Sequence, residues 1–163
     1  MLGWSFGGVV AFQAAQYLSK KGFCVTGLLL IDSPYPRNHE PLPEQLIEYV
    51  LGGRFSSAKA GLADLVSEFC KNARLLGSYF ASEYKAVVGS KIKTVYLKSE
   101  ETIDTQAACG VQYPWLSDQN ARIAAIREWE TLVGDNIKVL PIPGNHFEPF
   151  LSHNASVLHP REN

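Results

Sequence analysis

The chain contains 163 residues, of which 46% are hydrophobic and 19% are charged, with 15 basic side chains against 16 acidic ones. This length corresponds to one ordinary domain, and the apolar fraction is large enough to form a core. A net charge of −1 without any Lys/Arg run leaves no basic surface for nucleic acid. The sequence lacks both an apolar stretch of membrane-spanning length and a signal peptide, so we expect a cytoplasmic protein. Three scattered cysteines are too few for a disulfide framework or a zinc site, and we expect no metal.

The first residues hold the most specific motif of the chain. Gly3, Ser5 and Gly7 form the pattern Gly-x-Ser-x-Gly, which is followed by an apolar, helix-like segment. In a nucleophile elbow the serine occupies a tight turn between a strand and a helix, and the glycines allow close backbone approach. The amide of Phe6 would then face a developing oxyanion, supported by the helix dipole. The alternative is a Gly/Ser turn that only caps a helix, and the elements that follow disfavour it.

The remaining elements are predicted from apolar periodicity and turn residues. In chain order they are a helix from residue 9 to a basic end at 20–22, a strand at 25–31, helices at 43–51 and 62–80, a strand at 92–97, a loop at 105–114, a helix at 121–130 and a strand at 137–140. The run at 25–31 is typical of a strand that is buried on both faces of a parallel sheet. The order of turn, helix and buried strand is the one that a nucleophile elbow requires.

A serine nucleophile needs a base, and His146 is the best placed of the four histidines. It lies in a glycine-bearing loop after the predicted strand at 137–140, where a hydrolase delivers its histidine to the carboxyl edge of the sheet. His39, His153 and His159 have no such setting.

The orienting acid has two candidate positions. Asp32 directly follows the strand after the elbow helix, so its side chain would reach the same sheet edge as Ser5. Glu100, Glu101 and Asp104 follow the next strand and would suit a hydrolase whose acid comes one strand later. The residues alone leave both positions open.

At this point the sequence resembles a thioesterase domain of the α/β-hydrolase fold, of the kind found at the C-terminus of polyketide synthases and nonribosomal peptide synthetases. The resemblance rests on residues 3–8 (GWSFGG), 29–33 (LLIDS) and 144–146 (GNH). In that family the acid follows the strand immediately after the elbow helix, which implies Asp32 rather than Asp104. The fold class implied is α/β, a partial α/β-hydrolase fold with a mainly parallel sheet and flanking helices.

The resemblance also implies a reaction. An acyl chain would arrive as a thioester on the phosphopantetheine arm of an acyl carrier protein, and no metal or diffusible cofactor would be needed. Ser5 would attack the thioester, His146 would act as general base, Asp32 would orient His146, and the Phe6 amide would contribute to the oxyanion hole. Residues 31–43 (IDSPYPRNHEPLP) resemble fungal polyketide synthase thioesterases, including those that release their product by cyclisation.

Residues 36–90 correspond in this resemblance to a helical lid insertion that lines an acyl tunnel. The aromatic lid candidates are Phe69, Tyr79, Phe80 and Tyr84. Plain packing in the core is the alternative for each of them.

A complete hydrolase places several strands before its elbow, whereas Ser5 here has four residues before it. We therefore expect residues 1–163 to be a thioesterase domain without its N-terminal strands, with an exposed sheet edge, low stability and weak or no activity. Two other functions remain open: a carboxylesterase or lipase-like hydrolase of the same fold, which an acid at Asp104 would favour, and a non-catalytic hydrolase fragment that binds a carrier protein.

Overall fold

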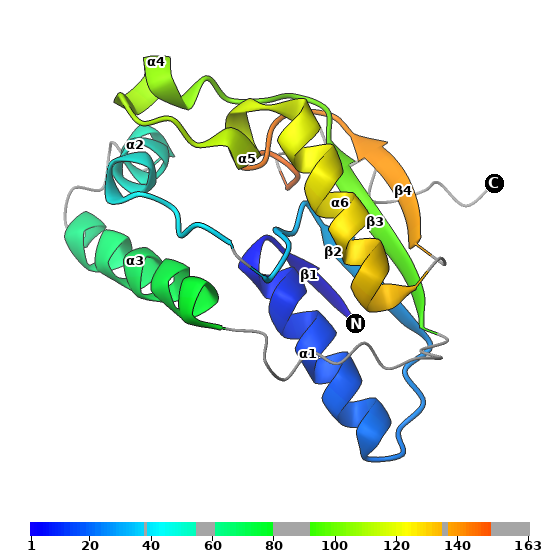
Figure 1. The fold of residues 1–163 in the computed structure, drawn as a ribbon. Coiled ribbons are helices and arrows are strands. Elements are labelled where there is room, and N and C mark those ends of the chain that lie inside the picture. Colours follow the sequence, from blue (N-terminus) through cyan, green and yellow to red (C-terminus); the bar gives the residue numbers. More distant parts are fainter. Residues whose placement is uncertain (38, 55–60, 80–91, 135–136, 151–163) are drawn as a thin grey trace.

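The structure is a computed structural model that describes residues 1–37, 39–54, 61–79, 92–134 and 137–150. Four strands are described: β1 (Leu2–Trp4), β2 (Gly27–Ile31), β3 (Lys93–Ser99) and β4 (Ile137–Ile142). Six helices are described: α1 (Phe6–Lys20), α2 (Glu44–Arg54), α3 (Leu62–Ser78), α4 (Thr105–Cys109), α5 (Pro114–Ser117) and α6 (Gln119–Val133). Figure 1 shows how these elements are arranged.

The strands form one parallel sheet in the order β1-β2-β3-β4. The register places Trp4 beside Ile31 and Ile31 beside Leu97, so the strands end close to one line. Parallel strands end at the same edge of a sheet, and loops that follow them meet there. The predicted fold class, a mainly parallel sheet with flanking helices, is confirmed.

The helices α1 and α6 pack on the same face of the sheet (Figure 1). Their interface is built on Trp129, whose ring is fully buried and meets Phe12 edge to face at 5.2 Å between ring centroids. Leu28 and Leu30 of β2 face this core, whereas Leu29, which alternates with them, is only half-buried. The opposite face carries Ile31, which is buried with Leu97 and Ile142, as well as the half-buried Leu29. The prediction that this strand is buried on both faces is therefore confirmed at Ile31 and wrong at Leu29, because α1 and α6 cover the face of Leu28 and Leu30.

The prediction of a loop over 105–114 is also wrong. Residues 105–109 form the short helix α4, and Pro114 begins a second short helix, α5. The Asp104 side chain accepts a hydrogen bond from the Ala107 amide and caps α4, and Gly110 ends it with a φ of 73°. The helix is too short to show apolar periodicity, which is why the sequence pattern missed it.

The helices α2 and α3 form a pair that is set apart from the sheet (Figure 1). They pack on each other through Ile47 and Leu51 of α2 and Val66 of α3. This pair lies within the predicted lid insertion at 36–90, and its role as a lid stays a prediction. Of the aromatic lid candidates, Phe80 and Tyr84 lie outside the described residues. None of the described helices combines the length and apolar character needed to cross a membrane.

Candidate active site

The turn between β1 and α1 has the geometry of a nucleophile elbow. Ser5 has φ 52° and ψ −128°, a strained conformation for a residue with a side chain. Its amide donates to the Ile31 carbonyl at 2.9 Å, which extends the β1–β2 ladder by one residue and fixes the turn. The turn therefore holds the Ser5 side chain at the carboxyl edge of the sheet.

The two predicted elbow glycines, Gly3 and Gly7, differ in their surroundings. A Cβ at Gly3 would lie 2.0 Å from the Gly7 carbonyl oxygen, so only glycine fits at residue 3. A Cβ at Gly7 would meet nothing within 4 Å, so the expected clash does not occur there. At Gly8, by contrast, a Cβ would lie 1.7 Å from the Ser33 hydroxyl oxygen. Close approach therefore requires glycine at residues 3 and 8. Gly3 of β1 lies against the first turn of α1, and Gly8 of α1 lies against Ser33 in the loop after β2.

Asp32 directly follows β2 and is 1% exposed. Its φ is 45°, and its amide donates to the Leu97 carbonyl at 2.8 Å, so the ladder again continues past the strand. One carboxylate oxygen, Oδ1, accepts from the Ser99 amide at 3.1 Å. The other, Oδ2, lies 2.9 Å from Nδ1 of His146 and also accepts from the Arg122 guanidinium.

His146 lies in the loop after β4 and is also 1% exposed. The loop is held by hydrogen bonds of its own, since Asn145 accepts from the Phe147 amide through its side chain and donates to the Glu148 carboxylate through its backbone. The imidazole Nε2 lies 3.1 Å from the Ser5 hydroxyl oxygen. The structure thus brings the three predicted residues Ser5, His146 and Asp32 into one hydrogen-bonded line.

The charge state of Asp32 follows from its contacts. Burial alone would raise the pKa of the carboxyl, but the hydrogen bond and charge of His146, the charge of Arg122 and the Ser99 amide together lower that pKa below its usual value. Asp32 is therefore an ionised acceptor at neutral pH and accepts a hydrogen bond from the protonated Nδ1 of His146. The unprotonated Nε2 is then left to accept from the Ser5 hydroxyl.

The competing acid candidates do not approach His146 in this way. The Asp104 carboxylate caps α4, while the amides of Glu100 and Glu101 donate to the carbonyls of Ile142 and Gly144. These backbone bonds tie the loop after β3 to the loop that carries His146. Of the other histidines, His153 and His159 lie outside the described residues.

Two residues at the site were not singled out from the sequence. The Trp4 indole N–H donates to the His146 carbonyl at 2.9 Å, and Arg122 binds Asp32 through a buried ion pair. A signal for Arg122 was present, because this residue shares the buried face of α6 with Ile126 and Trp129, at intervals of three and four residues. A cation on the apolar face of a predicted helix requires a buried partner.

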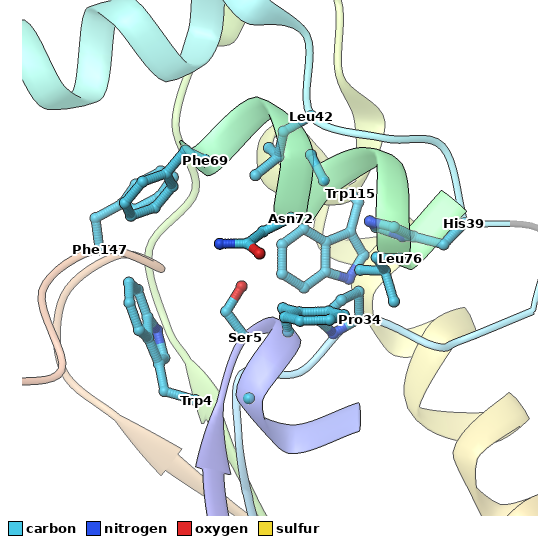
Figure 2. A pocket seen from close by; sticks show the side chains of 13 residues that line it. Trp4, Ser5, Pro34, His39, Leu42, Phe69, Asn72, Leu76, Trp115 and Phe147 are labelled. Carbon is cyan, nitrogen blue, oxygen red and sulfur yellow. The ribbon is translucent and has the colours of Figure 1, made fainter. Parts of the chain in front are cut away.

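An apolar cavity of about 200 Å³ opens beside Ser5. Its lining is mainly aromatic and aliphatic and consists of Trp4, Ser5, Phe6, Gly7, Pro34, His39, Leu42, Phe69, Asn72, Ala73, Leu76, Trp115 and Phe147. Figure 2 shows the Ser5 hydroxyl directed into this space, with Asn72 of α3 facing it. The cavity is somewhat larger than the roughly 150 Å³ that holds a benzene ring in an engineered protein core.

His39, at one wall of this cavity, is a neutral polar group. Its Nε2 lies 3.2 Å from the Tyr113 hydroxyl, which donates its own proton to the Glu40 carbonyl at 2.6 Å. Burial and the charge of His146 lower the pKa of His39 to about 4.

No group of three or more His, Cys, Asp or Glu side chains within the described ranges could hold a metal ion.

Comparisons with known proteins show the family to which this chain belongs. The family model of the thioesterase domain matches residues 1–162. An orsellinic acid synthase of Armillaria mellea is 33% identical over 159 residues, covering 96% of this chain and 7% of the synthase. An orsellinic acid synthase of Beauveria bassiana is 34% identical over 185 residues, covering 96% of this chain and 8% of the synthase. The chain therefore spans less than a tenth of the length of either relative.

Among solved structures, the NocB thioesterase domain in covalent complex with a fluorophosphonate nocardicin G analog superimposes with a TM-score of 0.61 at 23% identity. The match covers 94% of this chain and 60% of that one, and it supports the fold. The resemblance noted from the motifs is thereby confirmed: this chain belongs to the thioesterase domain family, a family of hydrolytic enzymes built on the α/β-hydrolase fold.

Proposed function

We propose that this chain is an acyl-thioesterase in which Ser5 is the nucleophile, His146 the general base and Asp32 the acid that orients His146. The observation that supports this most directly is the hydrogen-bonded line from Asp32 through His146 to Ser5 beside an apolar cavity. A serine hydroxyl is a weak nucleophile at neutral pH, and such a line of base and acid activates it.

The first half of the reaction is the acylation of Ser5. Its Oγ attacks the thioester carbonyl carbon while the hydroxyl proton passes to Nε2 of His146. The ionised Asp32 stabilises the imidazolium that forms. The tetrahedral intermediate then collapses, the C–S bond breaks, and the leaving thiolate takes the proton from Nε2. The products of this step are a free thiol and an acyl ester on Ser5.

The second half releases the acyl group. Water, or a nucleophile within the acyl chain, attacks the ester carbonyl while its proton passes to His146. Collapse returns that proton to Ser5 Oγ. Release to water gives hydrolysis, and release to an internal nucleophile gives cyclisation.

The oxyanion formed in both halves would be stabilised at the start of α1. Phe6 is the first residue of this helix, where backbone N–H groups have no acceptor within the helix. The Phe6 amide and the helix dipole can therefore stabilise negative charge next to Ser5.

The substrate that we propose is an acyl group carried by the phosphopantetheine arm of an acyl carrier protein. The matched relatives include the orsellinic acid synthases and a non-reducing polyketide synthase of Aspergillus terreus, and the cavity offers an apolar, largely aromatic wall to an acyl chain. Phe69 and Leu76 of α3 line this cavity, which supports a lid role for the α2–α3 pair. The substrate brings its own phosphopantetheine, so we propose no further cofactor.

The experiment that tests this proposal uses two probes on the purified protein. A fluorophosphonate should label the wild-type protein. The wild-type protein should also release the free thiol from a short acyl thioester of N-acetylcysteamine, which mimics the end of the phosphopantetheine arm. Ser5→Ala should abolish both signals. Ser19→Ala, at an exposed position of α1, should retain both. Equal labelling of Ser5→Ala and the wild type would contradict the proposal.

The alternatives appear as distinct outcomes of the same experiment. A kcat/KM that is higher for a matched oxygen ester than for the thioester would indicate a carboxylesterase. Absence of labelling in a wild-type protein that unfolds cooperatively would indicate a non-catalytic domain.

A further inference from the structure

The buried arginine Arg122 donates hydrogen bonds to three groups behind the candidate site, and its guanidinium lies over the Trp115 ring. It lies on α6 and is 2% exposed. Its Nη2 is ion-paired with Oδ2 of Asp32, and its Nη1 donates to the carbonyl of Glu101 at 2.9 Å and that of Ser99 at 3.3 Å. The guanidinium thus links the acid to the loop after β3.

The pairing has an electrostatic consequence for the histidine. A single oxygen, Oδ2 of Asp32, accepts both from Nδ1 of His146 and from Arg122. Without a cation, the whole carboxylate charge would stabilise the imidazolium form of His146. With Arg122 in place, the ion pair has no net charge, so the protonated form of His146 gains less from its neighbour.

The other titratable groups near the histidine do not replace this charge. His39 is neutral near pH 7, because its pKa is lowered to about 4. Tyr96 donates its hydroxyl to the Ser33 carbonyl and is neutral too, since burial raises its pKa well above the usual value. Glu148 accepts from the Asn145 amide in the His146 loop and adds negative charge on that side. Within the described residues, Arg122 is the cation that is paired with Asp32 in the buried site.

We propose, on the basis of the proposed function, that Arg122 is a positioning residue that sets the pH range in which His146 acts as an unprotonated base. It acts through Asp32, whose carboxylate it holds toward His146 and whose charge it balances. A purely structural role would require only that the ion pair fill the space between α6 and the sheet. The two roles differ in their effect on the protonation of His146.

The test compares Arg122→Met, which removes the charge, and Arg122→Lys, which keeps it. The rate of Ser5 labelling by a fluorophosphonate is measured against pH for each. Arg122 and His146 both bind Oδ2 of Asp32, and loss of a charge within about 4 to 6 Å of a titratable group changes its pKa by about one unit or more. We therefore expect the acid limb of the Arg122→Met profile to move up by about one pH unit, and that of Arg122→Lys to move by less than half of this. Arg127→Met, at an exposed position of the same helix, should leave the limb in place.

A second measurement does not depend on catalysis or on Arg122→Met. The His146 imidazole is titrated by ¹⁵N NMR in Ser5→Ala and in Ser5→Ala with Arg122→Gln, where glutamine keeps a hydrogen-bond donor. We expect the pH midpoint of the His146 titration to move up by about one unit when Arg122 is replaced by glutamine. An unchanged titration of His146 in a folded Arg122→Gln protein would overturn the inference. Absence of labelling in the wild type would instead contradict the proposed function and leave the NMR test in force.

Discussion

Trp4, the residue before Ser5, fixes the loop that carries His146. Its indole N–H donates to the His146 carbonyl at 2.9 Å, and its ring stacks on the imidazole with 5.4 Å between the ring centroids and 29° between the planes. The end of β1 and the loop after β4 are thereby joined across the sheet edge. One side chain thus relates the position of the proposed base to that of the proposed nucleophile.

We expect Trp4→Phe to lower kcat/KM about five- to tenfold. The substitution keeps an aromatic ring but leaves the His146 carbonyl without this donor, at a cost of about 1 kcal/mol. Trp4→Ala should cost more, because the stacking surface is lost as well. The check is kcat/KM on the thioester together with the free energy of unfolding. A lower free energy of unfolding without any change in kcat/KM would show that Trp4 does not position His146.

A second prediction separates the two acid candidates that the sequence left open. Asp32→Asn should lower kcat about 10³- to 10⁴-fold, because an amide favours the wrong imidazole tautomer and carries no charge for the imidazolium. Asp104→Asn should stay within about twofold of wild type, because asparagine caps a helix as well as aspartate does. Both variants are measured on the same thioester. Comparable losses in the two would contradict the assignment of Asp32 as the orienting acid.

The elements that the sequence predicted well are those with a long and regular pattern. The strand β2 and the helix α6 were predicted near their observed positions, because apolar runs and helical periodicity extend over enough residues to be distinctive. The helix α4 was missed, because five residues cannot show a helical period. The burial of β2 was overestimated at Leu29 but not at Ile31, because the side of the sheet on which a helix packs is set by tertiary structure.

The candidate site was predictable to the extent that local motifs define it. Ser5, Asp32 and His146 each carry a local signature, and the parallel sheet then brings the three loops to one edge. Trp4 and Arg122 act through contacts with residues distant in sequence, and no local pattern reports such a contact. The apolar face of α6 indicated that Arg122 is buried, but the identity of its partner came only from the fold.

A third prediction concerns the wall of the cavity. Phe69 of α3 lines the cavity beside Ser5, and Figure 2 places it next to Phe147. Phe69→Ala should raise KM for an acyl thioester about tenfold with little change in kcat, because it removes apolar contact that substrate and transition state share. Phe23→Ala, at a position that is 64% exposed, is the matched control and should change neither constant. A loss confined to kcat would place Phe69 outside the acyl site.

The last prediction follows from the lowered pKa of His39. The folded protein holds this imidazole neutral down to a pKa of about 4, whereas the unfolded chain protonates it near 6.5. The unfolded state therefore binds more protons between these two values, so the free energy of unfolding should be highest above pH 6.5 and should fall as the pH is lowered toward 4. The difference between the two pKa values corresponds to a loss of about 1 to 3 kcal/mol for this partly exposed ring. His39→Gln, which can still hydrogen bond to Tyr113 but cannot ionise, should reduce the slope between pH 6.5 and 4.5. Urea unfolding at a series of pH values measures both slopes, and equal slopes would mean that His39 ionises as readily in the folded protein as in the unfolded chain.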